Sequence, residues 1–158
     1  MNFDAAVQAL VDGGVEFIVI GGWSAIIHGS SFTTNDLDIF FPRNPDNLHR
    51  LVGALAPFHP RPRDFPAELP FLWEEATLRN GTVFTMTTDF GIVDLLAEVT
   101  GLGSFEEVKA TAVAVDAFGR RVLTLDLSSL IQAKRAAGRE KDLRALPELE
   151  SLLEAEEP

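Results

Sequence analysis

Hydrophobic and polar positions follow two different periods along the chain. Apolar residues spaced by three and four positions predict amphipathic helices, and Asn, Pro and Gly mark where these helices begin or end. Helices are expected at residues 3–11, from Asn44-Pro45 to about 55, at about 104–109, at 127–137 and at about 140–153. Short runs rich in β-branched and aromatic residues lie between them and are typical of strands. The chain is therefore expected to mix helices and strands.

The first predicted strand is Val15 to Ile20, which is almost wholly apolar and should be buried on both faces. Gly21-Gly22 ends it, and a short helix over residues 24–28 follows. The next strand, 36–41, has the sequence DLDIFF. Further strands are expected on both sides of the Asn80-Gly81 turn, after the turn at 89–91, and around Gly119.

Residues 57–70 contain five of the nine prolines and are predicted to form a long ordered loop without regular structure. Arg61 and Arg63 make this loop locally basic, so it either contacts an anionic acceptor or partner, or its arginines only solvate it. No repeat or linker divides the chain. We expect one α/β domain over residues 1–158, with a core at about 15–150 and an acidic end at 151–158.

Composition narrows the functional classes. The 158 residues are 46% hydrophobic, which suits one folded domain, and no apolar run approaches the ~20 residues of a membrane span. The absence of cysteine excludes disulfides, thiolate zinc sites and cysteine nucleophiles. A net charge of -11 disfavours broad binding of nucleic acid. With no signal segment visible, a cytoplasmic location is expected. The glutamates from Glu148 onward are interpreted as a solvated helix face.

Two aspartates in the strand 36–41 are the first chemical signal. Asp36 and Asp38 project from the same face, because side chains alternate along a strand. Two like charges on an otherwise apolar strand repel and lose solvation, so they favour a compensating cation such as Mg²⁺. The alternative is a sheet face open to water, on which the pair is simply solvated.

The glycines before this strand supply a second signal. Gly21 and Gly22 allow the backbone to approach a ligand closely, and free N–H groups at the start of the following helix suit a phosphate. The hydroxyls of Ser24, Ser30 and Ser31 lie nearby in the sequence. Phosphate donors beside metal-binding carboxylates are what a nucleoside triphosphate with Mg²⁺ requires.

Asp94 is a third carboxylate, in the apolar run GIVDLL. A charge in such a strand is costly unless it is paired or binds a metal. Its simpler alternative is a salt bridge to Arg120, Arg121 or a later lysine. Three carboxylates from two strands suffice to hold one or two metal ions during phosphoryl displacement.

These residues resemble the nucleotidyltransferase superfamily with the DNA polymerase β-type fold. Its signature is a strand, Gly-Gly or Gly-Ser, a DxD pair and a third Asp on a later strand, as in GGWSAIIHGSSFTTNDLDI followed by Asp94. The late segment LIQAKRAAGREKDL is similar to small bacterial nucleotidyltransferase-like proteins, related to antibiotic and toxin–antitoxin nucleotidyltransferases. The resemblance extends from Phe17 to about Leu149 and implies a mixed β-sheet flanked by α-helices.

The resemblance also implies roles for individual residues. Gly21 and Gly22 match the phosphate-binding glycines, and Asp36 and Asp38 match the metal-binding pair. Asp94 matches the carboxylate that binds metal and helps to deprotonate the attacking hydroxyl. Lys134 and Lys141-Asp142 match charged positions of the C-terminal helices, with Lys134 either binding triphosphate or solvated. Phe32 and Glu140 depart from the family pattern, which commonly has Arg and Pro there.

Two functions fit these sequence features. The favoured one is Mg²⁺- or Mn²⁺-dependent transfer of a nucleoside monophosphate from a nucleoside triphosphate to a hydroxyl of an unidentified small-molecule, RNA-end or protein acceptor. The rival is a weak or inactive module that keeps the fold and binds a protein partner. His28 as a base and Trp23 as a stacking residue are weaker candidates than a structural hydrogen bond and a core position.

Overall fold

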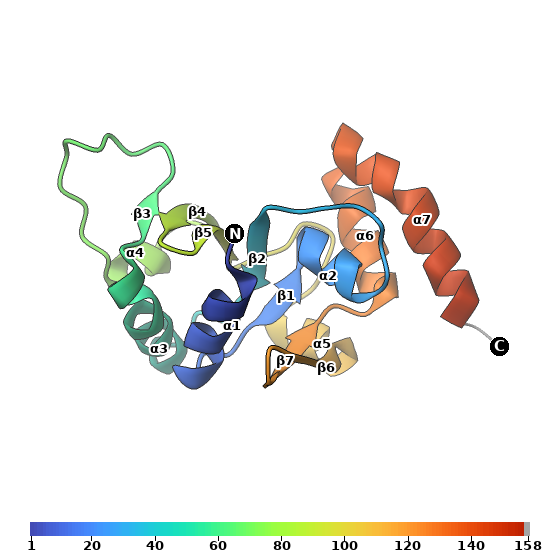
Figure 1. Ribbon diagram of the computed structural model, residues 1–158, viewed down its shortest axis with the longest axis horizontal. Coiled ribbons are helices and arrows are strands. Elements are labelled where there is room, and N and C mark those ends of the chain that lie inside the picture. The colour runs from blue at the N-terminus through green and yellow to red at the C-terminus, as the bar shows by residue number, and fades with distance from the viewer. Residues whose placement is uncertain (157–158) are drawn as a thin grey trace.

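A single mixed sheet of seven strands organises residues 1–156, the part of the chain that the computed structural model describes (Figure 1). The strands are β1 (Ile18–Ile20), β2 (Asp36–Phe40), β3 (Arg61–Pro62), β4 (Val83–Thr88), β5 (Gly91–Leu96), β6 (Val113–Ala117) and β7 (Arg120–Thr124). Their order in the sheet is β3-β4-β5-β2-β1-β7-β6. The pairs β2–β5 and β1–β7 are parallel, and the other four are antiparallel. The expected mixed α/β fold is confirmed.

The same residues also form seven α-helices and one 3₁₀ helix. They are α1 (Phe3–Asp12), α2 (Gly21–Ile27), α3 (Pro45–Leu55), η1 (Ala56–Phe58), α4 (Glu75–Arg79), α5 (Phe105–Thr111), α6 (Leu127–Ala137) and α7 (Glu140–Glu156). Local signals set several ends: the side chains of Asn2 and Asn44 accept backbone N–H groups of α1 and α3, and Gly138 ends α6 with a φ of 65°. No helix within residues 1–156 is both long and apolar enough to cross a membrane.

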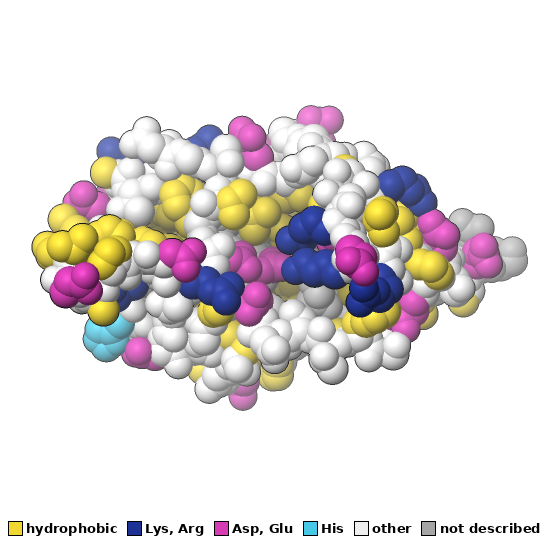
Figure 2. All heavy atoms as spheres, turned by 90° about the horizontal axis from the view of Figure 1, so that it is seen from above, with side chains coloured by type: hydrophobic (Ala, Val, Ile, Leu, Met, Phe, Trp, Pro, Cys, Tyr) yellow, Lys and Arg dark blue, Asp and Glu magenta, His cyan; other side chains and the backbone are white. Residues whose placement is uncertain are grey.

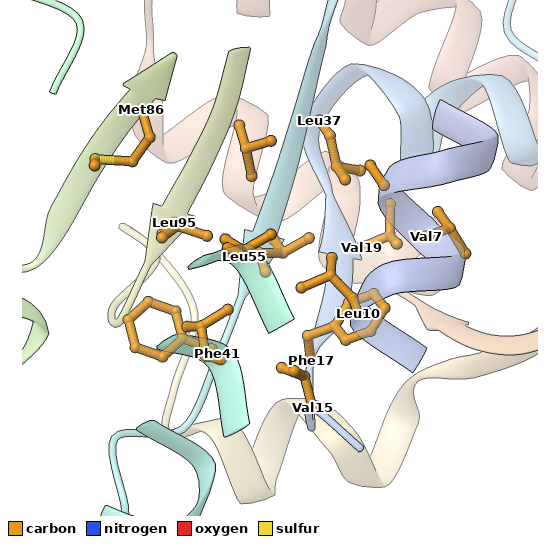
Figure 3. Close-up of a cluster of buried hydrophobic side chains, with 14 of the residues drawn as sticks. Val7, Leu10, Val15, Phe17, Val19, Leu37, Phe41, Leu55, Met86 and Leu95 are labelled. Atoms are coloured by element: carbon orange, nitrogen blue, oxygen red, sulfur yellow. The ribbon is translucent and has the colours of Figure 1, made fainter. Parts of the chain in front are cut away.

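Two hydrophobic clusters form the core. The first contains buried residues of β2, β5, α1 and α3, among them Leu37, Ile39 and Leu95. Figure 3 shows Leu37 and Leu95 of this cluster between strands and helices. The second contains Phe40 and Ile20 with residues of α5, α6 and α7. Neighbouring residues of β2 therefore contribute to different clusters, as strand alternation requires. Asp36 and Asp38 alternate with buried Leu37 and Ile39.

The predicted hairpin around Asn80-Gly81 is wrong. Residues 75–79 form helix α4, whose Leu78 is fully buried in the first cluster, and the preceding Trp73 donates its indole N–H to the carbonyl of Val52 on α3. Burial against α3 outweighs the local turn signal, so β4 pairs instead with β5 and β3.

Loop 57–70 is also more regular than expected. It begins within η1, and its residues 61–62 form β3, which pairs with β4 at the sheet edge. Prolines are tolerated at such an edge because only one side of the strand is hydrogen-bonded. The acidic end is helical through Glu156, and the expectation for Glu157 and Pro158 lies outside the described residues.

Candidate functional site

The three aspartates singled out in the sequence lie along one pocket. In the parallel pair β2–β5, Asp38 stands opposite Asp94, and Asp36 lies two residues earlier on the same face of β2. All three line a cavity of about 240 Å³ together with Lys134, Arg139 and Lys141. On the face shown in Figure 2, acidic side chains lie beside a group of Lys and Arg side chains near the middle of the molecule.

The carboxyl groups of Asp38 and Asp94 interact directly with each other. Burial raises the pKa of Asp38 to about 8, and the hydrogen bond with Asp94 and the charges of Asp94 and Asp36 add to this rise, whereas Lys134 opposes it. The raised pKa of Asp38 means that two negative charges are disfavoured here, and a bound cation would relieve their repulsion with release of the proton.

The donor set suits a hard divalent cation in its chemistry. Carboxylate oxygens are the ligands that Mg²⁺ prefers, and the raised pKa of Asp38 shows that negative charge at this place is disfavoured without a compensating cation. Within residues 1–156, no group of three His, Asp or Glu side chains already stands as a ready-made metal site. Asp36, Asp38 and Asp94 share this cavity, and metal binding by them stays a prediction.

The two glycines make room for this acidic group. Gly21 has a φ of +67°, and a Cβ there would lie 2.1 Å from Oδ2 of Asp38. A Cβ on Gly22 would lie 2.9 Å from the side chain of Thr34. Both glycines line the cavity, so their backbone can approach a ligand there. Phosphate binding by Gly21 and Gly22 stays a prediction.

Ser24 does not fit the role predicted for it. Its side chain is fully buried and its hydroxyl lies 2.6 Å from that of Thr124 on β7, away from the residues that line the cavity. Sequence proximity to the glycines suggested a phosphate donor, but the turn of α2 directs this side chain against the sheet. Ser30 does line the cavity, and its hydroxyl donates to the carboxylate of Glu148 on α7. Glu148 is half-buried and held by the serines, whereas Glu150 and Glu154 are exposed, as expected for a solvated helix face.

Lys134 lies toward the cavity rather than in solvent, since its side chain is only 15% exposed. Its Nζ lies 3.5 Å from Oδ1 of Asp142, a carboxylate that is 1% exposed. Nε of Arg139 donates to the same carboxylate at 2.6 Å. Burial opposes the negative charge of Asp142, but the hydrogen bond from Arg139 and the charges of Arg139 and Lys134 leave its pKa lowered overall.

Arg139 is the site residue that sequence reasoning missed. It follows Gly138, whose left-handed conformation reverses the chain between α6 and α7 and brings Arg139 back to the cavity. The signal was present in the GREKD segment, where Arg stands between a helix-ending glycine and the paired Lys141-Asp142. A local pattern alone did not indicate on which side of the turn the guanidinium would lie.

A second compartment adjoins the first. This cavity of about 290 Å³ also includes Gly21, Asp38, Lys134 and Arg139. Its remaining lining is mostly apolar and comes from β1, β4, β5, α6 and the segments that follow the strands: Ile20, Val83, Leu96, Val99, Leu125, Leu130 and Ala133. Asp38 therefore lies at the border between a polar and an apolar half of one cleft.

The other candidates have structural contacts. His28 places Nε2 at 2.6 Å from the carbonyl oxygen of Leu125, and Trp23 is buried between the rings of Phe3 and Phe118. Arg61 donates to the carbonyls of Pro66 and Leu69, both at 2.9 Å, so it closes its own loop. Nη2 of Arg61 is thus engaged within its own loop, and whether Arg61 and Arg63 contact an acceptor or partner or only solvate the loop stays a prediction.

Comparison with known proteins adds no family assignment. The sequence matches no protein-family model, and a search of curated proteins also finds no match.

Proposed function

We propose that the protein is a Mg²⁺- or Mn²⁺-dependent nucleotidyltransferase. It would move a nucleoside monophosphate from a nucleoside triphosphate to a hydroxyl of an acceptor and release pyrophosphate. The observation that carries this proposal is the single cavity in which Asp36, Asp38 and Asp94 face Lys134 and Arg139. A metal–triphosphate complex needs both kinds of group, carboxylates for its cations and cations for its phosphates.

The positions of the side chains in the cavity support the following roles. Asp36, Asp38 and Asp94 would hold the metal, which supplies Lewis-acid stabilisation of the phosphoryl charge when bound. Lys134, held by Asp142, and Arg139 would bind phosphate oxygens. The acceptor oxygen bonds to the α-phosphorus as the bond from that phosphorus to the bridging oxygen breaks, and pyrophosphate leaves with the electron pair. Asp94 is assigned to receive the proton of the acceptor hydroxyl.

The apolar half of the cleft supports a small organic group beside Asp38. Its lining carries no cation besides Lys134 and Arg139, both of which border the polar half as well. A net charge of -11 argues against broad binding of nucleic acid, so an RNA acceptor would enter by a single end. The proposal keeps the cytoplasmic setting expected from the sequence.

The test uses each of the four nucleoside triphosphates, labelled at the α-phosphate, with Mg²⁺ or Mn²⁺ and fractionated cell extract as the acceptor source. Label transfer should fall at least ~100-fold in Asp94→Asn, the loss typical of a general base. Asp116→Asn is the matched control, because Asp116 is an exposed strand aspartate paired with Arg121. Absence of metal-dependent triphosphate binding to the parent protein, measured by calorimetry, would overturn the proposal.

A second candidate is the inactive module that binds a protein partner. The exposed apolar side chains of Leu69 and Leu72, which are 48% and 69% exposed, favour it, since such residues in a long loop are often binding contacts. Label transfer by the parent but not by Asp94→Asn would reject an inactive module. Stable capture of one protein without any transfer would support it.

A further inference from the structure

The loop between α2 and β2 holds a carboxylate that comes from the far end of the sequence. The Ser30 hydroxyl donates to Oε1 of Glu148, and the Ser31 hydroxyl donates to Oε2, both at 2.5 Å. The backbone N–H of Ser31 is shared between the same two oxygens at 3.1 and 3.2 Å. We call this set of donors, from Ser30 and Ser31, the serine seat.

The serine seat is built to receive an anion. Its donors converge on both oxygens of one group, and the backbone N–H of Phe32 donates to Oγ of Ser30 and so orients that hydroxyl. Hydrogen bonds from the Ser30 and Ser31 hydroxyls lower the pKa of Glu148, so the seat stabilises the charged form. Loop hydroxyls and amides of this kind also suit the oxygens of a phosphate.

One residue of the serine seat, Ser30, lines the cavity of the proposed active site. Ser30 lines the cavity that contains Asp36, Asp38 and Asp94, and Phe32 and Lys141 line it as well. Glu148 itself does not line this cavity, but its carboxylate is hydrogen-bonded to Ser30, which does. Leu149, the next residue, is fully buried in the second core cluster, so α7 remains docked if the Glu148 side chain leaves.

We propose that the serine seat is a phosphate-binding subsite in which the Glu148 carboxylate occupies the place of a phosphoryl group. This inference rests on the proposed nucleotidyl transfer, because it assigns the seat to a phosphate of the triphosphate or of the pyrophosphate product. Bound phosphate displaces Glu148 by rotation of its side chain. The apparent affinity for phosphate is therefore the intrinsic affinity multiplied by the fraction of molecules in which the seat is free of Glu148.

Inorganic pyrophosphate is the probe, titrated with and without Mg²⁺ and followed by calorimetry and by the amide NMR signal of Ser31. Glu148→Gln should bind it about tenfold more tightly than the parent, because the competing charge is gone. Glu150→Gln is the matched control: it removes the same charge from the same helix, where Glu150 pairs with Arg135 at 2.6 Å. This control should leave the affinity within about twofold of the parent, since exposed charges are screened.

The serines provide the second arm. Ser30→Ala with Ser31→Ala, added to Glu148→Gln, should cancel the gain, and in the parent background it should weaken pyrophosphate binding. An equal gain in Glu148→Gln and Glu150→Gln, or a Ser31 amide that does not respond to pyrophosphate, would overturn the seat. If Glu148→Gln is less stable and does not bind pyrophosphate more tightly, Glu148 only stabilises the fold and the proposed subsite is rejected. If Glu148→Gln does not fold, the variant Ser30→Ala with Ser31→Ala in the otherwise unchanged protein tests the proposal, because it should bind pyrophosphate more weakly than the parent.

The experiments distinguish the phosphate subsite from the proposed transferase activity, because either proposal can be rejected while the other stands. Pyrophosphate binding that depends on Ser30, Ser31 and Glu148 in a protein without label transfer would keep the subsite and reject the transferase. Label transfer with an affinity indifferent to Glu148 would do the reverse.

Discussion

At the scale of single residues, the site depends on the absence of a side chain at Gly21. Gly21 has a positive φ and leaves the space into which the Asp38 carboxylate extends. Any Cβ at this position would collide with Oδ2 of Asp38, so the acidic pair and the glycine depend on each other. Gly119 has a similar φ of +75° but no atom within 4 Å of its Cβ position.

This contrast predicts different costs for two identical substitutions. Gly119→Ala should lose about 1–2 kcal/mol, the usual cost of a left-handed conformation. Gly21→Ala should lose at least ~1 kcal/mol more, because the carboxylate must also move, and should weaken binding of Mg²⁺. Urea denaturation of both variants with and without Mg²⁺ measures the difference. Equal losses and an unchanged response to Mg²⁺ would show that Gly21 has only a backbone role.

At the scale of secondary-structure elements, the corner between α6 and α7 organises the cationic side of the cavity. Gly138 reverses the chain, and Asp142 in the first turn of α7 accepts from Arg139 and lies close to Lys134 of α6. The buried carboxylate thereby fixes two cations that face the aspartates of β2 and β5. Figure 1 shows α6 and α7 side by side at one end of the molecule.

Asp142→Asn should therefore affect both folding and binding. We expect a loss of about 1–3 kcal/mol, since a buried charge-assisted hydrogen bond is replaced by a weaker one. Binding of the Mg²⁺–triphosphate complex should weaken by at least ~3-fold as Lys134 and Arg139 lose their common anchor. Glu140→Gln, which breaks the exposed Glu140–Arg144 pair on the same turn, is the control and should change neither quantity measurably. Chemical denaturation and calorimetry provide the two readouts.

At the scale of the whole molecule, the acidic pair links folding to pH and to metal. In the folded protein Asp38 keeps its proton up to about pH 8, whereas in the unfolded chain it loses it near its ordinary pKa of 3.8. The folded state therefore binds more protons between these values, and this contribution to stability is full below about pH 4 and is lost as the pH rises through about 8. The overall charge of -11 opposes folding in the same direction at high pH.

We expect the melting temperature of the metal-free parent to fall between pH 6 and pH 9, and Asp38→Asn to flatten this fall. At pH 8.5 the metal-free variant should be at least as stable as the parent, because the repulsion of Asp36 and Asp94 is relieved. Mg²⁺ should raise the melting temperature of the parent by mass action, more at pH 8.5 than at pH 6, and should have little effect on the variant. Calorimetric scans at three pH values test this, and an undiminished Mg²⁺ shift in Asp38→Asn would contradict it.

Much of the fold could be predicted because its signals are local. Asn2, Asn44-Pro45 and Gly138 mark helix ends through contacts within a few residues. The common face of Asp36 and Asp38 follows from the pleat of a strand. The hairpin at Asn80-Gly81 failed for the opposite reason: Leu78 and Trp73 are held by contacts with distant parts of the chain, and these outweigh the turn signal.

The sequence by itself determined the element types, the alternation that places two carboxylates on one face of β2, and the glycines that precede them. Only the tertiary structure decided which groups meet. The Ser24 hydroxyl is hydrogen-bonded to a residue 100 positions away and the Ser30 hydroxyl to one 118 positions away. Ser24 is therefore buried against the sheet, whereas Ser30 lines the cavity and holds the carboxylate of Glu148. Likewise burial in the folded core raises the pKa of Asp38, and the parallel register of β2 and β5, which sets Asp38 against Asp94, adds to this rise. Local periodicity fixes directions along an element, whereas these pairings depend on how the whole core packs.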